Sequence, residues 1–127
     1  MDEQVALSRR ERQIMDVVYV LGQASVTEVF ERLPDPPARV SVRTLLRILE
    51  QKGRLKHRQQ GKEFIYLPTQ PRAQAAHSAL DRVLSTFFGG SIEQALAAHL
   101  SRRKVNVSDE EFQRLETLIR QARDKGR

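Results

Sequence analysis

Two arginines stand four residues apart in the stretch "SVRTLLRILEQKG", which begins at Ser41. Apolar residues recur there with a helical period, so a helix is predicted over residues 42–52 with Val42, Leu45, Leu46 and Leu49 on its buried face. Its opposite face would carry Arg43, Thr44 and Arg47. An arginine can donate two hydrogen bonds to O6 and N7 of guanine, and an α-helix fits the major groove of DNA. The spacing therefore favours recognition of base edges in duplex DNA.

Two further helices are predicted before this one, over residues 9–21 and 26–33. Each follows a serine with a glutamate three residues later, the pattern of a capping box. The pairs are Ser8 with Glu11 and Ser25 with Glu28. The stretch "PDPP" at residues 34–37 cannot continue a helix, so a rigid loop should lead into the third helix. A short helix, a turn and a helix that exposes arginines together indicate a helix-turn-helix.

A β-hairpin is predicted next, with strands over residues 55–59 and 63–67 and a turn at "QQGK". Beside the third helix it would form a wing, whose Arg58 and Lys62 are expected to touch phosphates rather than bases. Ser41 is expected at the start of the third helix, where unpaired N–H groups and the helix dipole attract a phosphate. In the bland interpretation, Ser41 is only a helix cap.

The positive charge of the chain is concentrated around these elements. The whole chain has a formal net charge of +6, whereas residues 37–72 hold nine basic and two acidic residues, a net +7, and the remainder is at −1. Such a field fits a polyanionic partner. The alternative is that these arginines are simply solvated on an outer helix face.

The last third of the chain has a different character. Helices are predicted over residues 75–88, 92–100 and 109–122, with capping boxes at Ser91 with Gln94 and Ser108 with Glu111. Their apolar stripes are expected to pair with a second copy of the chain, through Leu80, Leu84, Phe87, Phe88, Leu96, Phe112, Leu115 and Ile119. The alternative is that they fold back onto their own winged domain.

The predicted fold class is mainly α with a small β-hairpin. A winged helix-turn-helix domain is expected at residues 1–70, followed by a helical dimerisation domain at residues 71–127.

Composition argues against several other functions. The absence of cysteine excludes disulfides, thiolate metal sites and a cysteine nucleophile. His57, His77 and His99 lie far apart in sequence, so no metal site and no cofactor are expected. The chain shows no acid/base pair, no nucleophile beside a base and no phosphate-binding glycine loop, which argues against an enzyme. No apolar run would span a bilayer and the start has no signal-peptide core, so the chain is expected in the cytosol.

Four stretches together are similar to a known family. "LSRRERQIMDVVYVLGQASVTEVFERL", "SVRTLLRILEQKG" with "GKEFIYLP", and above all "FFGGSIEQALAAHLSRRKVNVSDEEFQRLETLI" resemble the BlaI/MecI family of penicillinase repressors, which includes copper-responsive members. The resemblance covers about residues 7–122 and implies a homodimer that binds a palindromic operator and blocks transcription. It implies that Ser41, Arg43, Thr44 and Arg47 read DNA, with a wing at residues 57–64.

The resemblance also bears on regulation. Copper-responsive members carry a C-terminal cysteine motif, which this chain lacks. In β-lactam-responsive members a membrane-bound sensor protease leads to cleavage of the repressor in its dimerisation region, and the matching place here is near His99 and Leu100. A different class of function stays open beside the repressor: a winged-helix protein–protein interaction module whose basic face is incidental.

Overall fold

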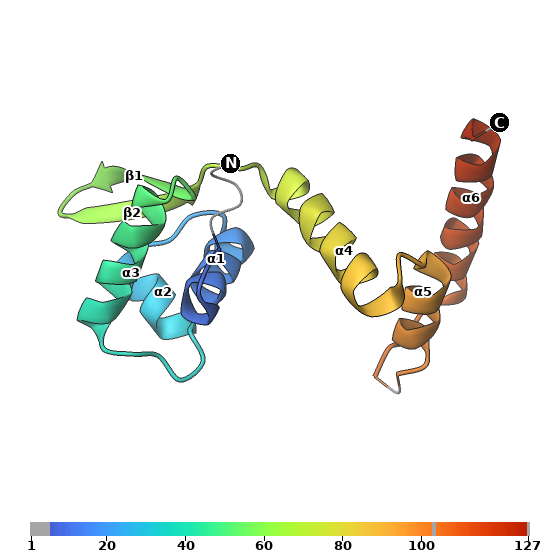
Figure 1. Ribbon diagram of the computed structural model, residues 1–127, viewed down its shortest axis with the longest axis horizontal. Helices are drawn as coiled ribbons and strands as arrows, with labels where there is room; N and C mark the ends of the chain where they lie inside the picture. Colours follow the sequence, from blue (N-terminus) through green and yellow to red (C-terminus); the bar gives the residue numbers. More distant parts are fainter. Residues whose placement is uncertain (1–5, 103, 127) are drawn as a thin grey trace. The chain divides into compact units, whose positions relative to one another are not determined.

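The computed structural model describes residues 6–102 and 104–126 (Figure 1). Eight elements follow one another along the chain. They are α1 (Arg9–Leu21), α2 (Val26–Arg32), α3 (Arg39–Gln51), β1 (Leu55–Gln60), β2 (Glu63–Pro68), α4 (Arg72–Phe88), α5 (Ile92–Leu100) and α6 (Asp109–Lys125). The predicted fold class is confirmed: the chain is mainly helical, with one two-stranded antiparallel sheet.

Helix α1 begins and ends where the sequence predicts. The Ser8 side chain accepts a hydrogen bond from the Glu11 amide while Glu11 bonds back to the Ser8 amide, so the first turn is fully capped. Gly22 ends the helix at φ 87°, a conformation that an L side chain rarely adopts. Helix α2 has the same capping box, made by Ser25 and Glu28. At Ser91 and Ser108 only the serine half of the predicted box is present.

Three predicted helix bounds are wrong. Helix α3 begins at Arg39 rather than residue 42, because the chain after "PDPP" turns directly into a helix whose N-cap, Ala38, makes no side-chain cap. Helix α4 begins at Arg72 rather than residue 75, since the Ala75 amide already donates to the Pro71 oxygen at 3.0 Å. Helix α6 runs on to Lys125 rather than ending at residue 122, because no helix breaker precedes Gly126.

The core lies among α1, α2, α3 and the hairpin. Ile14, Val18, Val29, Val42, Leu46 and Leu49 are fully buried there, and Leu55 and Tyr66 close it from the hairpin side. Tyr66 also exchanges two backbone hydrogen bonds with Ala24, at 2.8 and 3.0 Å, which ties β2 to the α1–α2 connection. This arrangement holds α3 and the hairpin rigidly side by side (Figure 1).

The chain divides into two compact units that meet between Ala79 and Leu80. The first contains α1 to β2 and the start of α4, and the second the rest of α4 with α5 and α6. The division falls inside α4, whereas the predicted domain boundary precedes it. The assignment of residues 1–70 to a DNA-binding domain and of residues 71–127 to a dimerisation domain stays a prediction.

The described residues of the second unit form no buried core. None of the residues of α4, α5 and α6 is buried. Several large apolar side chains are instead mostly open to solvent, namely Leu80, Phe87, Ile92, Leu118 and Ile119. These helices are amphipathic, yet within the second unit their apolar faces stay largely uncovered.

Among the described residues, no helix is long and apolar enough to cross a membrane.

Candidate nucleic-acid interface

The outer face of α3 is the most distinctive charged surface of the first unit. Val42, Leu46 and Leu49 point into the core at 0% exposure, so the residues on the opposite side of the helix must face outward. Arg43, Thr44 and Arg47 are all exposed there, as the sequence predicts. Such a face can donate hydrogen bonds to base edges or phosphates.

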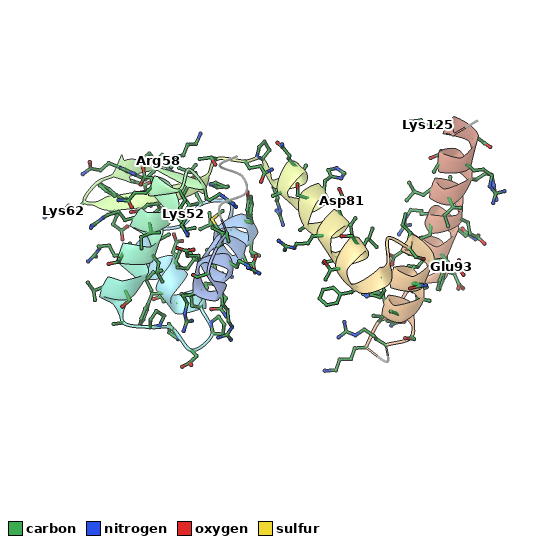
Figure 2. All side chains as sticks on the ribbon, viewed as in Figure 1. Lys52, Arg58, Lys62, Asp81, Glu93 and Lys125 are labelled. Carbon is green, nitrogen blue, oxygen red and sulfur yellow. The ribbon has the colours of Figure 1, made fainter. Side chains whose placement is uncertain are left out.

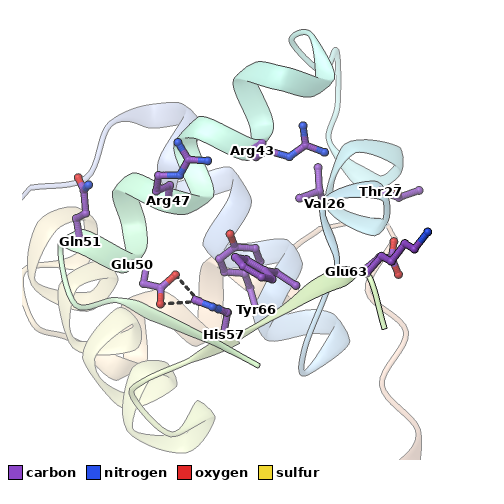
Figure 3. A pocket seen from close by; sticks show the side chains of 11 residues that line it. Val26, Thr27, Arg43, Arg47, Glu50, Gln51, His57, Glu63 and Tyr66 are labelled. Atoms are coloured by element: carbon purple, nitrogen blue, oxygen red, sulfur yellow. Dashed lines mark hydrogen bonds and ion pairs between the residues drawn. The ribbon is translucent and has the colours of Figure 1, made fainter. Parts of the chain in front are cut away.

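A groove runs between α3 and the hairpin (Figure 3). Arg43 and Arg47 line it from the helix, and Lys62 lines it from the hairpin turn. Figure 2 shows Lys62 at the tip of the hairpin, where Gly61 adopts φ 64° and lets the strands reverse. The structure therefore brings three of the six predicted DNA-binding side chains together around one groove, and a fourth, Thr44, lies on the same helix face.

His57 fastens the hairpin to α3. Its Nδ1 lies 2.7 and 2.8 Å from the two carboxylate oxygens of Glu50 (Figure 3). Its ring stacks on Phe64, with centroids 4.0 Å apart and an interplanar angle of 14°. Glu50 is the acidic residue that α3 contributes to the groove, and this contact draws its carboxylate toward the hairpin.

Buried Tyr66 lies beneath this groove. Burial raises the pKa of its phenol, and the negative charge of Glu50 raises it further, while Arg47 and Arg43 act in the opposite direction. The fields of both arginines thus reach the floor of the groove.

Lys52 does not belong to this charged face, although the sequence counts it in the basic segment. Its Nζ lies 2.9 Å from the buried carboxylate of Glu11 and 3.2 Å from the backbone oxygen of Ala6. Burial alone would raise the pKa of Glu11, but hydrogen bonds from Lys52 and Ser8, with the charge of Lys52, lower it overall. Lys52 therefore ties the end of α3 to the start of α1.

Two predicted site residues lie away from the groove lining. The amide of Ser41 donates to the Ala38 oxygen at 2.9 Å, because the helix already began at Arg39, so this N–H is not open to a phosphate. Ser41 is not the helix cap either. Arg58 alternates with His57 along β1 and so faces the other side of the hairpin, where it donates to Gln23 and Gln60.

The residues predicted for dimerisation all lie in the second unit. Leu80, Phe87, Phe112 and Ile119 are exposed, and Leu84, Phe88, Leu96 and Leu115 are half-buried.

Sequence comparison decides what kind of protein carries this arrangement. The family model described as penicillinase repressor matches residues 7–121, which is nearly the whole chain. The chain belongs to the penicillinase repressor family. It is therefore a DNA-binding transcriptional repressor rather than an enzyme, and its winged helix-turn-helix is the expected fold.

Individual proteins that resemble this chain are between 15% and 31% identical to it over the parts that align. The DNA-binding domain of the repressor BlaI is 27% identical, covers 51% of this chain and 82% of its own, and has a TM-score of 0.47. The CopR repressor is 31% identical, with coverages of 52% and 99% and a TM-score of 0.45. BpsR of Bordetella bronchiseptica is 15% identical over 95% of this chain and 78% of its own, with a TM-score of 0.48. An uncharacterised 16.5 kDa protein of Latilactobacillus sakei is 27% identical over 107 residues, 81% of this chain and 72% of its own.

Sequence reasoning on this penicillinase repressor family member missed the ion pair of Glu11 with Lys52 and the contact of His57 with Glu50. Glu11 was predicted as a capping residue only, and His57 only as part of the wing. Glu11 and Lys52 are 41 residues apart, and no periodic pattern links them. Within the described parts of the chain, no three His, Asp or Glu side chains are grouped so that they could hold a metal ion.

Proposed function

We propose that this repressor inserts the outer face of α3 into the DNA major groove, with the hairpin as a wing beside it. The observation that carries the proposal is the division of α3 into two faces. Its core face is fully buried at Val42, Leu46 and Leu49, while Arg43 and Arg47 stand exposed along the groove. In this pose Arg43, Thr44 and Arg47 meet base edges, and Lys62 meets a phosphate.

Ser41 and Arg58 have a smaller part in this proposal. Ser41 is half-buried and keeps only its hydroxyl for a contact with DNA. Arg58 faces the outer side of the hairpin, so it can meet a phosphate only if the DNA backbone passes along that side. We therefore propose phosphate contacts for both and base contacts for neither.

We further propose that two copies pair through α4, α5 and α6. Phe87 is 74% and Ile92 71% exposed in one chain, and such large apolar surfaces are stabilised by removal from water. A twofold dimer would present two copies of α3 to half-sites about one DNA turn apart, so the operator would be palindromic.

Relief of repression by proteolysis is the third part of the proposal, and the family resemblance motivates it. Helix α5 ends at Leu100, and Ser101, Arg102 and Lys104 are exposed outside the helices. A cut near His99 or Leu100, made through a membrane-bound sensor protease, would separate α5 from α6 and remove part of the surface that two copies share. Intact-mass spectrometry of the protein from induced cells would reveal two fragments with a junction near residue 100, and a full-length mass after induction would contradict this part.

Operator binding by an arginine variant tests the DNA-reading face. Arg43→Ala should weaken binding to the cognate operator by roughly 1–3 kcal/mol, and relax the preference at one base pair, because a bidentate contact is lost. Arg120→Ala, an exposed position on α6, removes the same charge outside the first unit and serves as the control. Binding of both variants should decrease steeply with salt. Equal affinity of Arg43→Ala and wild type would show that another surface reads DNA. Weak duplex binding by wild type without sequence preference would instead favour the protein–protein interaction module.

A further inference from the structure

The earlier start of α3 adds one residue to its outer face. Val40 lies in the first turn of the helix and is 63% exposed. Residues 40, 43, 44 and 47 are three, four and seven positions apart, so they share one stripe of the helix surface. Val40 therefore stands in line with Arg43 and Arg47, at the end of the stripe nearest the helix-turn-helix loop.

Among the described residues, Val40 takes no part in the core cluster. The core of the first unit takes Val42, Leu46 and Leu49 from the other face of α3, and Val40 is not among the residues packed against that core. The fold of its own chain leaves most of this isopropyl group in water, so we look for its contribution in what the helix contacts.

Thr44 presents a second methyl group beside it. The Thr44 hydroxyl donates to the backbone oxygen of Val40 at 3.1 Å, so its one donor hydrogen is engaged within the helix. What Thr44 can still offer a ligand is its γ-methyl group and the acceptor capacity of its oxygen. Val40 and Thr44 thus form a small apolar patch, which we call the methyl patch, on a stripe that is otherwise cationic.

Arg39, the cation that directly precedes Val40, is turned away from the methyl patch. Arg39 donates to Thr27 Oγ1 at 3.0 Å, and its guanidinium carbon lies 5.1 Å from the centre of the Phe30 ring. Both partners belong to α2, so the first turn of α3 shows its ligand an apolar surface, followed by Arg43 and Arg47 further along.

Base edges in the major groove offer one apolar group, the C5-methyl of thymine, and small aliphatic side chains are its usual partners. We propose that the methyl patch of Val40 and Thr44 selects thymine at an operator position beside those read by Arg43 and Arg47. This assignment rests on the proposed function, because it requires α3 to lie in the major groove.

The test uses the full-length protein and begins by selecting operators from a random duplex library. A library from which nothing is enriched would count against the proposed function itself. In the enriched operator the thymines are then replaced by deoxyuridine one position at a time. The replacement removes the methyl group and leaves every hydrogen-bonding group of the base in place. At one thymine per half-site, wild-type affinity should decrease about fourfold, the effect of one methyl-sized group leaving an apolar contact.

Three variants identify the residues responsible. Val40→Ala shortens the apolar side chain and favours the helix, and Thr44→Ser removes the γ-methyl while keeping the hydroxyl that bonds the Val40 oxygen. At least one of them should bind the thymine and deoxyuridine operators equally. Val20→Ala changes a valine of similar exposure, 65%, on α1 and should retain the wild-type fourfold difference.

Two results would overturn the assignment while leaving the repressor function intact. One is an operator that wild type binds specifically and in which no deoxyuridine substitution changes the affinity. The other is a fourfold difference that both Val40→Ala and Thr44→Ser retain, which would place the thymine contact elsewhere.

Discussion

The two units of this repressor contain helices of similar amphipathic character but differ in what covers their apolar faces. In the first unit, α1, α2, α3 and the hairpin bury one another's apolar residues, and Ile14, Val18, Leu46 and Leu49 are wholly inaccessible. In the second unit α4, α5 and α6 bury no residue. The hydrophobic period of a helix therefore predicts which face will be buried. It does not predict whether that face packs against the same chain or against another one.

This contrast assigns different tasks to the two units. On the proposed function, the first holds its DNA-reading surface within one chain, whereas the second buries its apolar faces against a second copy. On the proposed function, the concentration of the protein would then control operator binding through the second unit, without changing the shape of the first.

Leu115→Glu should have the largest effect on this contrast. A twofold interface would bury the new carboxylate twice, once from each copy, at a cost of several kcal/mol per buried charge. We expect a monomer by analytical ultracentrifugation, a normally folded first unit, and much weaker operator binding. Gln113→Glu places the same side chain on the opposite side of α6 and should remain a dimer. A Leu115→Glu protein that stays dimeric would move the pairing surface away from α6.

Leu46→Ala should have the next largest effect and should be confined to the first unit. The side chain is fully buried, so its truncation removes apolar contacts and leaves a cavity, costing about 2–5 kcal/mol. The loss in urea unfolding should be independent of protein concentration. Ile119→Ala is the matched truncation on a side chain that is 54% exposed in one chain. Its effect should be largest at concentrations where the wild type is dimeric and should vanish as dilution separates the copies. A stability loss in Leu46→Ala that depends on protein concentration, or one in Ile119→Ala that does not, would contradict the difference between the two units.

The buried pair of Glu11 and Lys52 gives a smaller, pH-dependent effect within the first unit. Lys52→Ala should cost about 2 kcal/mol at neutral pH, because a buried carboxylate loses its charged hydrogen-bond partner. The pKa of Glu11 lies below its ordinary value of 4.5, so the unfolded chain takes up the proton first as the pH falls. The stabilisation is therefore complete above pH 4.5 and is lost as the pH decreases through the folded-state pKa.

Urea unfolding between pH 3 and pH 6 checks whether the stabilisation by Glu11 is lost as the pH falls. Glu11→Gln should unfold with a weaker pH dependence than wild type below pH 4.5. An identical pH dependence in the two proteins would show that Glu11 does not link α1 to α3 in the way described.

The contact between His57 and Glu50 should have the smallest effect. Both side chains are about one-third exposed, at 32% and 34%, so the pair contributes about 0.2–1 kcal/mol to stability. Its consequence should be clearer in DNA binding, because His57→Ala frees the Glu50 carboxylate in a groove proposed to meet phosphates. We expect a decrease of about threefold in operator affinity, on the order of 0.6 kcal/mol. Adding Glu50→Gln should restore most of it, whereas a loss that persists in the double variant would mean that His57 acts through the shape of the hairpin alone.

The sequence predicts most of the first unit because its signals are local. Ser8, Glu11 and Gly22 mark both ends of α1, and the period of Val42, Leu46 and Leu49 identifies the buried face of α3. The start of α3 was predicted wrongly because Ala38 carries no capping side chain, and the serine three residues later resembled a cap. That error hid Val40 from the predicted DNA-reading face.

Contacts between distant parts of the chain could not be predicted in the same way. The positions of Lys52 against Glu11 and of His57 against Glu50 follow from how α1, α3 and the hairpin pack, not from any spacing in the sequence. The direction in which Arg58 points could not be predicted either, because the side of the hairpin that it faces depends on the register of β1 with β2. The roles of the predicted DNA-binding and dimerisation residues stay predictions until the variants above are measured.

Amide hydrogen exchange of the full-length protein over a wide range of concentrations tests the contrast most directly, because it reports on both units in one molecule. We predict that α1, α2, α3 and the hairpin keep the same protection at every concentration, while protection of α4, α5 and α6 disappears as dilution separates the copies. Equal protection of the last three helices in a sample shown to be monomeric would contradict the account.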